Sequence, residues 1–498
     1  MLFAPDWPLY ALFTSLLLSP IIDLLGHRRG LKRLANGYLV LSFGLGLALL
    51  LALFTSPLIW EEARWPFVVS YGLPGVGTCF IVDRASLFLS STAFLIAFSS
   101  ALYSLGRGPF RPGFCVAFSA LVLGMVGVLC SGDLLTFYVF WEIMCLAAYA
   151  LVFMGERSEA LEAAWKYFVM GSVGAIVMLF AIAILYGLAG TLNMPLLAQR
   201  LSDLRGPWPN IALVLFISGA GVEAALVPLH TWLPDAYSEA PTSISSVLAG
   251  ITTEIGFYGI LRTALTVFQS SSALWRLILA TLCVANMFVG NFCALVQSDV
   301  KRFLAYPSVA VIGYALAALV VSSEGALSAI LFLIFSHAIS KGLAFLCAGL
   351  LSSAVGSRDT SSLGAAMSRL PIASAAFLLS LVCKAGLPGT SGFVEKLILI
   401  YALLASPLWW WLAFFLVLNV IIGAGAYFRI IWTMLKRSGK PSEDVRARES
   451  WTDVLPVAIL SALILAFGIW PTPLLDMARL GAQDLADLQR YARAIGGG

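Results

Sequence analysis

Long apolar runs separated by short polar segments make up almost the whole chain, and the runs do not alternate with a period of two. A helix that crosses the hydrocarbon core of a bilayer needs about 20 predominantly apolar residues. The pattern therefore predicts an all-α polytopic membrane protein and argues against an outer-membrane barrel. The 14 predicted spans are 7–25, 36–57, 80–103, 113–130, 132–154, 161–189, 208–230, 241–265, 273–297, 300–322, 325–352, 371–404, 407–434 and 452–475.

Helix-breaking residues interrupt the seventh and twelfth predicted spans. The seventh contains VEAALVPLHTWLPD, and the twelfth contains CKAGLPGTSGFVEK. Proline removes a backbone donor and glycine tolerates the resulting break. Glu223 precedes Pro228 in the first break, and Lys384 precedes Pro388 in the second. Paired interrupted helices in corresponding halves are typical of inverted-repeat transporters with an ion site at the repeat interface.

The breaks predict how the chain is organised. Helices 1–3 occupy residues 1–112, and a first inverted repeat of helices 4–8 occupies residues 113–265. A second inverted repeat of helices 9–13 occupies residues 273–434. Helix 14 and a C-terminal surface tail occupy residues 435–498, and the polar stretch 476–498 is expected to form a surface helix.

Composition narrows the class of protein. Of the 498 residues, 60% are hydrophobic and 11% are charged, against about 45–50% and about 25% in a soluble domain, which excludes a soluble enzyme. The eight cysteines show no CxxC or Cys/His ligand spacing, so we expect no metal and no cofactor. No nucleotide-binding or hydrolase motif occurs, and no basic tail suggests a nucleic-acid partner.

Loop charges predict the orientation in the membrane. Loops after odd-numbered spans carry nearly twice as many Lys and Arg residues as loops on the opposite side. By the positive-inside rule the odd loops are cytoplasmic, so both termini lie on the non-cytoplasmic side. The N-terminus lacks the basic region of a signal peptide, so the first apolar run is expected to be a retained span. We expect an integral protein of the bacterial inner membrane.

Ionisable residues inside the predicted spans are the candidate functional groups, because charge within lipid is costly and usually functional. Four of the eight lysines fall inside spans, and Lys301, the second residue of the tenth span, is counted with the preceding loop. Burial brings the proton affinities of amines and carboxylates toward neutral pH, as a proton relay requires. The alternative is a static set of ion pairs that fixes helix packing. The candidates are Glu142, Lys166, Glu223, His230, Glu254, His337, Lys341, Lys384, Glu395 and Lys396.

Position within the spans separates these candidates. Glu142 lies deep in an apolar span, whereas Lys166 lies near the start of its span and has an alternative, snorkelling to the surface. His337 and Lys341 are four residues apart and share one helix face, which suits proton hopping through a neutral imidazole. His230 lies in the seventh-span break, where capping of the break is the alternative to proton transfer.

Two neighbouring pairs of charges have different expected roles. Glu395 and Lys396 point about 100° apart on a helix and need not pair with each other. Asp83 and Arg84 lie near the end of the third predicted span and are expected to be interfacial.

Several of these segments resemble one family closely. FWEIMCLAAYALV, VPLHTWLPDAYSEAPTSISSVLAGI, DVKRFLAYPSVAVIGYAL, FSHAISKGLAFLCAG and GLPGTSGFVEKLIL are similar to segments of the antiporter-like subunits of respiratory complex I. That family includes Mrp-type sodium/proton antiporter subunits and the pumping subunits of membrane-bound hydrogenases. The matches run in family order from about 80 to 435. The resemblance implies 14 spans, two inverted five-helix repeats and broken helices 7 and 12.

The resemblance also assigns residues by position. Glu142 matches the family's glutamate of span 5, and His337 with Lys341 matches its pair in span 11. Lys396 matches the lysine or glutamate of span 12, and Lys166 matches a span 6 lysine found in some branches.

Two glutamates depart from the family pattern. Glu223 stands where most members have the span 7 lysine, and Glu254 stands where many have the span 8 lysine. The family scheme pairs the span 5 glutamate with the span 7 lysine, and here that pair becomes Glu142 and Glu223. Two carboxylates in one dry site cannot both ionise cheaply, so we expect one to hold a proton and Lys166 to balance the other.

The first functional hypothesis is a proton-translocating subunit of a redox-driven membrane complex of the NADH:quinone oxidoreductase or membrane-bound hydrogenase type. Partner subunits would supply the driving force, because the chain shows no redox ligand set and no catalytic centre of its own. Protons would load at a hydrated half-channel, cross laterally and leave at the far end. The expected order is Glu142, Glu223 and Lys166, then Glu254, then His337 and Lys341, then Lys396 and Glu395.

The alternative is exchange of Na⁺ or K⁺ for protons in an Mrp-type antiporter complex. Glu142 and Glu223 would then form an oxygen-ligand cation site with carbonyls of the seventh-span break. A third class, a polytopic enzyme, would need a polar cluster at a membrane face. The expected partners are other membrane subunits and the lipid bilayer, with no nucleic acid.

Overall fold

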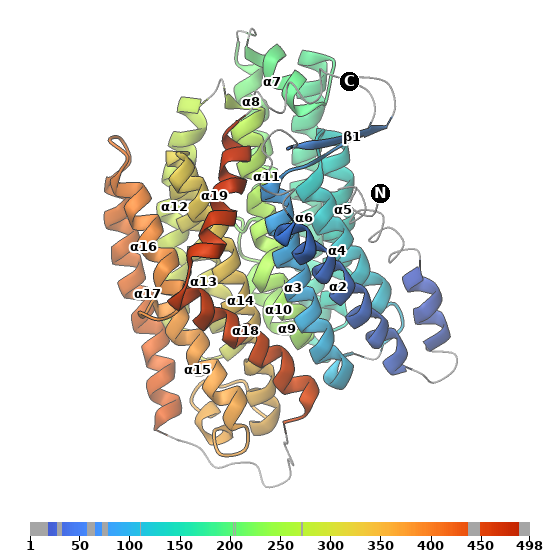
Figure 1. Ribbon diagram of the computed structural model, residues 1–498, viewed down its shortest axis with the longest axis vertical. Coiled ribbons are helices and arrows are strands. Elements are labelled where there is room, and N and C mark those ends of the chain that lie inside the picture. The colour runs from blue at the N-terminus through green and yellow to red at the C-terminus, as the bar shows by residue number, and fades with distance from the viewer. Residues whose placement is uncertain are drawn as a thin grey trace.

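Helices account for nearly all of the computed structural model (Figure 1), which describes residues 18–26, 32–56, 65–71, 78–109, 111–202, 204, 206–269, 272–436 and 449–487. The first helices are α2 (Lys32–Thr55), α3 (Arg84–Arg107), α4 (Phe114–Cys130), α5 (Leu134–Phe153), α6 (Glu159–Ala189), α7 (Met194–Ser202), α8 (Trp208–Glu223) and α9 (Leu233–Glu239). They are followed by α10 (Thr242–Val247), α11 (Thr253–Thr266), α12 (Ser272–Leu295), α13 (Val300–Val321), α14 (Glu324–Val355), α15 (Pro371–Ala385), α16 (Ser391–Leu404), α17 (Trp411–Leu435), α18 (Trp451–Ile469) and α19 (Thr472–Ala486). The strands β1 (Phe67–Tyr71) and β2 (Thr78–Val82) pair antiparallel.

Among the described residues, ten helices are long and apolar enough to cross a membrane. The helices follow the predicted spans along the chain, although residues 7–17 of the first predicted span lie outside the described residues. The chain is therefore an integral membrane protein, as the hydropathy pattern predicted.

Both predicted breaks are present. The seventh span is divided into α8 and α9, which are separated by residues 224–232. The twelfth is divided into α15 and α16, which are separated by residues 386–390. Glu223 is the last residue of α8, and Lys384 is the last but one of α15. Each break therefore places a charged side chain at the end of a half-helix inside the bundle.

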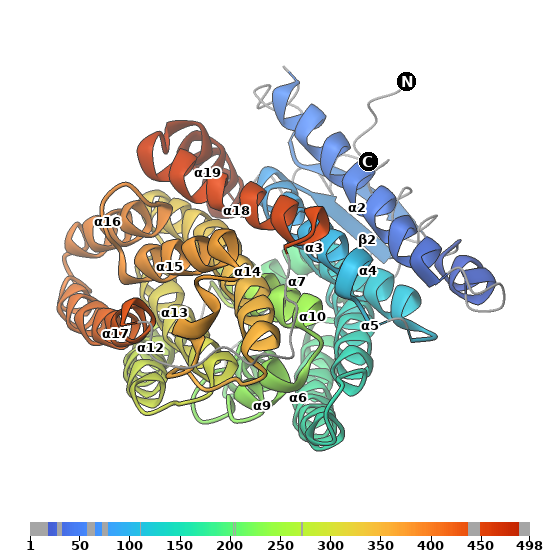
Figure 2. The same cartoon turned by 90° about the horizontal axis from the view of Figure 1, so that it is seen from below.

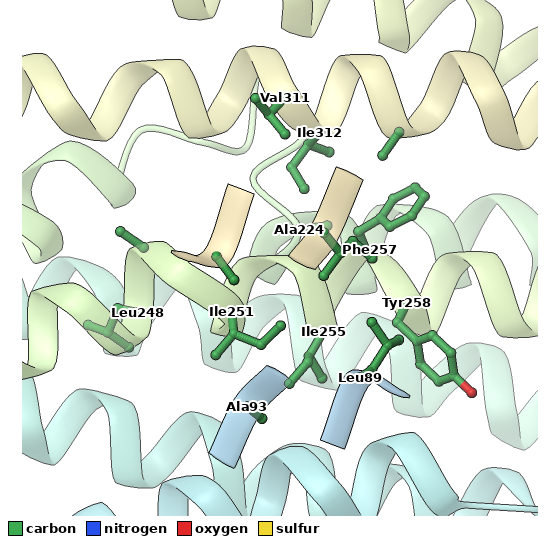
Figure 3. Packing of buried hydrophobic residues seen from close by; sticks show 14 of the residues in the cluster. Leu89, Ala93, Ala224, Leu248, Ile251, Ile255, Phe257, Tyr258, Val311 and Ile312 are labelled. Carbon is green, nitrogen blue, oxygen red and sulfur yellow. The ribbon is translucent and has the colours of Figure 1, made fainter. Parts of the chain in front are cut away.

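The eighth span has an irregularity that the sequence did not reveal. A π-helical turn, η3 (Leu248–Thr252), connects α10 to α11 and shifts the start of α11. π-Turns inside helices are frequent at functional sites. Glu254 lies in the first turn of α11, directly after this irregular turn. Figure 3 shows that Ile255 and its neighbours on α11 pack between apolar residues of α3 and α13.

Helix α14 lies near the middle of the bundle when the molecule is seen end-on (Figure 2). It packs against α3, α10, α13, α15, α16, α18 and α19. A helix that is apolar on every side is buried on every side, and nearly all of α14 is buried. Polar residues on this helix, including His337 and Lys341, are therefore enclosed by protein rather than by lipid.

Small residues bring two helices of the first predicted repeat close together. A Cβ on Gly174 of α6 would lie 2.9 Å from the Gly219 carbonyl oxygen of α8. A Cβ on Gly219 would lie 2.5 Å from the Gly174 carbonyl oxygen. Close helix packing through small residues is typical of membrane bundles. This contact holds the end of α8, and with it Glu223, against α6.

The pair Asp83 and Arg84 is buried inside the protein, and its expected position at the membrane interface stays a prediction. Asp83 is fully buried and accepts a bond from Arg262 at 2.7 Å. Arg84 is 1% exposed and its guanidinium binds Asp484 of α19 at 2.5 Å. Buried charges persist when they are paired, and each of these charges has a partner that is distant in sequence. Arg84 and Arg262 therefore carry no information about loop orientation.

The C-terminal segment also differs from the expected surface tail. Helix α19 packs against α3 and α14, and Asp484 on it is 2% exposed. Its apolar positions, such as Leu474 and Ala478, face the bundle. The sequence did not reveal this docking, because Asp484 and its buried partner Arg84 lie 400 residues apart in the chain.

Candidate functional site

A buried row of ionisable side chains begins at Glu254. The Glu254 Oε1 atom lies 3.1 Å from His337 Nε2, and both side chains are at most 1% exposed. The π-turn before α11 and the central position of α14 bring the two residues together. The two atoms are within contact distance, but neither has a hydrogen-bond partner among the described residues.

The second nitrogen of His337 extends the row to α15. His337 Nδ1 lies 2.5 Å from Lys384 Nζ at the end of that half-helix. A neutral imidazole accepts a hydrogen bond at one nitrogen and donates at the other. When Lys384 donates to Nδ1, the Nε2 atom carries the hydrogen and faces Glu254. His337 therefore connects a carboxylate to an amine across three elements of the fold.

Lys341 shares the face of His337 on α14, as its spacing predicted, but it points to a different partner. Its ammonium donates to the carbonyl oxygen of Leu304 on α13. The ammonium also lies 5.9 Å from the ring centre of Phe345. Lys341 is 1% exposed, so it is an amine buried within the bundle and close to both Glu254 and Lys384.

The row continues to α16 through a small cavity. Lys384, Glu395 and Lys396 line a cavity of about 10 Å³, which is the space that one water molecule needs. The Lys396 Nζ atom donates to Gly392 O at 3.2 Å and lies 3.6 Å from Glu395 Oε1. The two neighbours therefore do pair, although their directions on the helix did not require it.

Polar side chains without charge surround this cavity, and the sequence analysis missed them. Asn291 donates to Asn419 Oδ1 at 2.7 Å, and Tyr314 donates to the same atom at 2.8 Å. Asn291 and Tyr314 line the cavity. A search for asparagine as well as for charge inside apolar runs would have found this network.

Glu223 occupies a separate buried position in the first predicted repeat. Its Oε1 atom accepts a hydrogen bond from Tyr167 Oη at 2.5 Å, and its Oε2 atom lies 3.7 Å from Cys145 Sγ. The negative end of a helix dipole does not stabilise a carboxylate at the last residue of α8. Neutral donors from α5 and α6 stabilise it instead. Trp232 stacks on Tyr167 at 3.7 Å and fixes the donor ring.

Glu142 is half-buried on α5, where it interacts with Tyr138 and Cys145. Cys145 contacts Glu223 as well, so this thiol lies between the two glutamates that the sequence predicted to be neighbours. The two carboxylates are close enough to interact. The described residues therefore place Glu142 at the outer side of the Glu223 cluster.

Lys166 does not join these glutamates, which corrects its expected role as their counter-charge. Its side chain is 47% exposed, and its ammonium lies 2.7 Å from Glu162 and 3.1 Å from Asp235. The alternative that its position near the start of a span left open, an ammonium directed to the surface, agrees with this exposure.

The broken segment between α8 and α9 is held by a residue that the sequence analysis did not consider. Asn286 of α12 accepts from Val227 N at 2.9 Å and donates to Ala225 O at 3.0 Å. It therefore satisfies the backbone groups that the break frees. His230 lies partly exposed in the same break, and its buried Nδ1 atom has no hydrogen-bond partner among the described residues.

Tyr237 of α9 connects the first cluster to the buried row. Its hydroxyl contacts Thr253, the neighbour of Glu254, and donates to Leu248 O in the π-turn at 2.7 Å. Its ring lies 6.2 Å from that of Trp232. Tyr237 also interacts electrostatically with both Glu223 and Glu254. The other candidate residues therefore form one band of polar groups through the bundle, with Lys166 outside it and with no described contact that joins His230 to it.

No group of three His, Cys, Asp or Glu side chains that could hold a metal ion occurs in the described ranges. All eight cysteines are free thiols, and seven of them are buried. The thiol of Cys79, on the hairpin outside the helices, has a pKa raised to about 11 by burial and by Asp133.

Known proteins resemble this chain in both sequence and fold. Residues 131–423 match the family model described as NADH:quinone oxidoreductase/Mrp antiporter, transmembrane. The F(420)H(2) dehydrogenase subunit N of Methanosarcina mazei is 32% identical over 375 residues, which cover 73% of this chain and 75% of that protein. The NADH-quinone oxidoreductase subunit N of Desulforudis audaxviator is 33% identical over 391 residues, which cover 77% of each protein.

Solved structures agree with this match. A chain of the Mrp complex from Dietzia sp. superposes with a TM-score of 0.88 at 23% identity and covers 98% of both chains. A chain of the membrane-bound sulfane sulfur reductase, an archaeal respiratory membrane complex, superposes with a TM-score of 0.87 at 26% identity. That alignment covers 98% of this chain and 99% of the other.

Proposed function

Because the chain belongs to the NADH:quinone oxidoreductase/Mrp antiporter transmembrane family, we propose that it translocates protons as one membrane subunit of a redox-driven complex. Its sequence relatives are named as subunits of NADH-quinone oxidoreductase and F(420)H(2) dehydrogenase. Its partners are other membrane subunits, and these supply the redox chemistry.

One observation carries the proposal, the buried contact series Glu254–His337–Lys384. Each group in it exchanges a proton, and no side chain in it is more than 7% exposed. When Lys384 is a neutral amine that accepts from the Nδ1 hydrogen, the Nε2 atom of His337 is free. A proton that leaves the Glu254 carboxyl then adds to Nε2, and the Nδ1 proton passes to the Lys384 amine. The single-water cavity then connects Lys384 to Glu395 and Lys396.

Electrostatic coupling links the proton affinities of neighbouring groups in such a series. Two unit charges 4 Å apart interact by about 4 kcal/mol at an effective dielectric constant of about 20. A proton that moves at one contact therefore changes the proton affinity of the next group strongly. A redox-driven charge displacement in a partner subunit can bias the whole series in this way.

The first predicted repeat contributes differently. Glu223 is held by Tyr167 and Cys145 rather than by a lysine. We therefore assign Glu142 and Glu223 to proton exchange between carboxylates, and we assign Lys166 no part in the row. Glu223 and Lys384 both end a half-helix before a break, which supports the assignment of residues 113–265 and 273–434 as inverted repeats.

The location in the cell follows the same proposal. Arg107, Arg157 and Arg358, from three loops after odd-numbered spans, line one cavity, so these loops share one side of the molecule. We place that side in the cytoplasm, place both termini on the other side, and place the protein in the inner membrane of a bacterium.

The contacts of Glu223 bear on the antiporter alternative. The superposed chain of the Mrp complex is 23% identical to this chain, and a likeness at that identity shows the fold alone. A cation site at Glu142 and Glu223 needs free carboxylate oxygens, and both oxygens of Glu223 already accept from protein donors. This arrangement favours proton exchange over a cage for Na⁺ or K⁺.

The test uses the intact complex reconstituted in sealed proteoliposomes. Redox turnover is expected to acidify one side in choline buffer without Na⁺ or K⁺, because the proton itself is the transported ion. Proton movement that required Na⁺ or K⁺ and ran without redox turnover would instead identify an antiporter.

A further inference from the structure

A polar cavity of about 730 Å³ opens at the cytoplasmic ends of α13 and α14 as oriented above. It is larger than the cavity of about 10 Å³ beside Lys384, and charged side chains line it. They include Arg107, Glu239, Asp299, Lys301 and Arg358. A cavity of this size and polarity holds many waters, so it can bring protons to the bundle from one side.

Lys301 lies at the inner wall of this cavity. Its side chain is 4% exposed, and its ammonium donates to Ala240 O at 2.9 Å and to Ser245 Oγ at 3.2 Å. An ammonium has three N–H donors and a neutral amine has two. The two acceptors therefore hold the nitrogen in either protonation state, and the third hydrogen is left for a water in the cavity.

Three carboxylates act on Lys301, those of Glu239, Asp299 and Glu156, and the first two have contacts of their own. Glu239 accepts from Arg358 at 2.9 Å and lies 3.6 Å from Arg157. Asp299 caps α13 by accepting from the backbone N–H groups of Lys301 and Arg302 at 2.8 and 3.0 Å. Lys301 is held by neutral oxygens, so it does not need its charge to keep its position.

Residues next to the contacts of Lys301 on α10 and α13 bind α14 at Lys341 and its neighbour Gly342. Ser246, next to Ser245 on α10, donates to Gly342 O on α14 at 3.2 Å. Leu304, one turn after Lys301 on α13, accepts from the Lys341 ammonium. Three residues along a helix correspond to a rise of about 4.5 Å. The contacts of Lys301 and those of Lys341 are therefore about one helical turn apart along α13.

We propose that Lys301 is the residue through which protons pass from this cavity to Lys341 and the buried row. The Lys301 ammonium loses a proton and becomes a neutral amine, and the proton adds to the neutral amine of Lys341 by way of the Ser246 hydroxyl or a water. A hydronium ion in the cavity then protonates Lys301 again. The inference rests on the proposed function of the row.

A purely structural role, in which Lys301 only joins α10 to α13, makes a different prediction. Arginine keeps the charge and the hydrogen bonds but does not deprotonate in proteins. Under a structural role Lys301→Arg restores function. Under the proposed role Lys301→Arg stays inactive while the complex assembles.

The transport experiment compares Lys301→Met, Lys301→Arg, Lys341→Met and the control Lys436→Met in the reconstituted complex. Lys436 lies at the exposed end of α17, beside Trp432. Both Lys301 variants are expected to lower the proton flux about tenfold. Electron transfer measured with an uncoupler is expected to be retained. Wild-type flux in Lys301→Arg overturns the inference. Wild-type flux in Lys341→Met likewise overturns the inference, because Lys341 is the proposed acceptor. A fourth variant, Lys384→Met, removes the amine that contacts His337 in the row, and wild-type flux in that variant overturns the proposed function itself.

Labelling tests the cavity independently of transport. Ser352→Cys in the cavity wall is expected to react with a membrane-impermeant maleimide from the cytoplasmic side only. Ser380→Cys, at a fully buried position of α15, serves as the unreactive control. Absence of labelling at Ser352→Cys from that side would contradict a water-filled entry.

Discussion

At the scale of single residues, Glu223 depends on neutral hydrogen-bond donors. Its carboxylate is 2% exposed, and the hydroxyl of Tyr167 and the thiol of Cys145 are the protein donors that contact it. A buried polar group that loses its partner costs about 1–3 kcal/mol. The position of Glu223 is therefore sensitive to changes in residues that carry no charge.

Replacing Tyr167 by Phe removes the hydroxyl and keeps the ring that stacks on Trp232. We expect the variant to be less stable by about 1–3 kcal/mol, because one carboxylate oxygen loses its donor. The midpoint temperature of thermal unfolding of the purified complex measures this change. Tyr186→Phe, at an exposed position of the same helix, is the control. Equal midpoints for the two variants would show that the bond to Glu223 contributes nothing.

The sequence identified the charged members of the site but not their partners. Glu254, His337 and Lys384 stood out because charge inside an apolar run is rare. Asn286 was missed because it is uncharged, and Lys301 was assigned to a loop because it follows a span boundary. Which charges meet depends on tertiary packing, which hydropathy does not report.

At the scale of elements, the two broken helices place charge inside the bundle. The break between α15 and α16 brings Lys384 of the first half within reach of the cavity that Lys396 of the second half lines. The halves can approach because Gly392 has no side chain. A Cβ at that position would overlap the carbonyl oxygen of Cys383.

Gly392→Ala is therefore expected to separate α15 from α16 and to lower both assembly and proton transport. The control is Gly187→Ala in α6, where a Cβ would meet no atom within 4 Å. A helical Gly→Ala change without a clash stabilises by about 1 kcal/mol. The amount of assembled complex and the proton flux of both variants measure the effect. Full assembly and flux in Gly392→Ala would refute the requirement for close approach.

Local sequence signals predicted some elements and not others. Proline and glycine marked both breaks, because their backbone chemistry acts within a few residues. The π-turn at 248–252 contains one glycine, Gly250, but no proline, and a single glycine does not distinguish it from a regular helix. The docking of α19 was missed because Arg84 and Asp484 meet only in the folded bundle.

At the scale of the whole molecule, the chain is a membrane bundle in which a row of ionisable groups from α11, α14, α15 and α16 passes the central helix α14. Composition and run length predicted this class, because a 60% hydrophobic chain with long apolar runs has no other stable fold in water or lipid. The family match over residues 131–423 agrees with it. In the proposed function the bundle supplies the proton-exchanging residues and partner subunits supply the energy.

The coupling between redox turnover and proton movement tests this account most directly. The measurement is the number of protons moved per electron by the reconstituted complex that carries Lys341→Met, with Lys436→Met as the control. The account predicts that the ratio falls in Lys341→Met, because the buried amine between the entry cavity and the row is lost, while uncoupled electron transfer and the control stay at the wild-type level. An unchanged ratio of protons to electrons in Lys341→Met would contradict it.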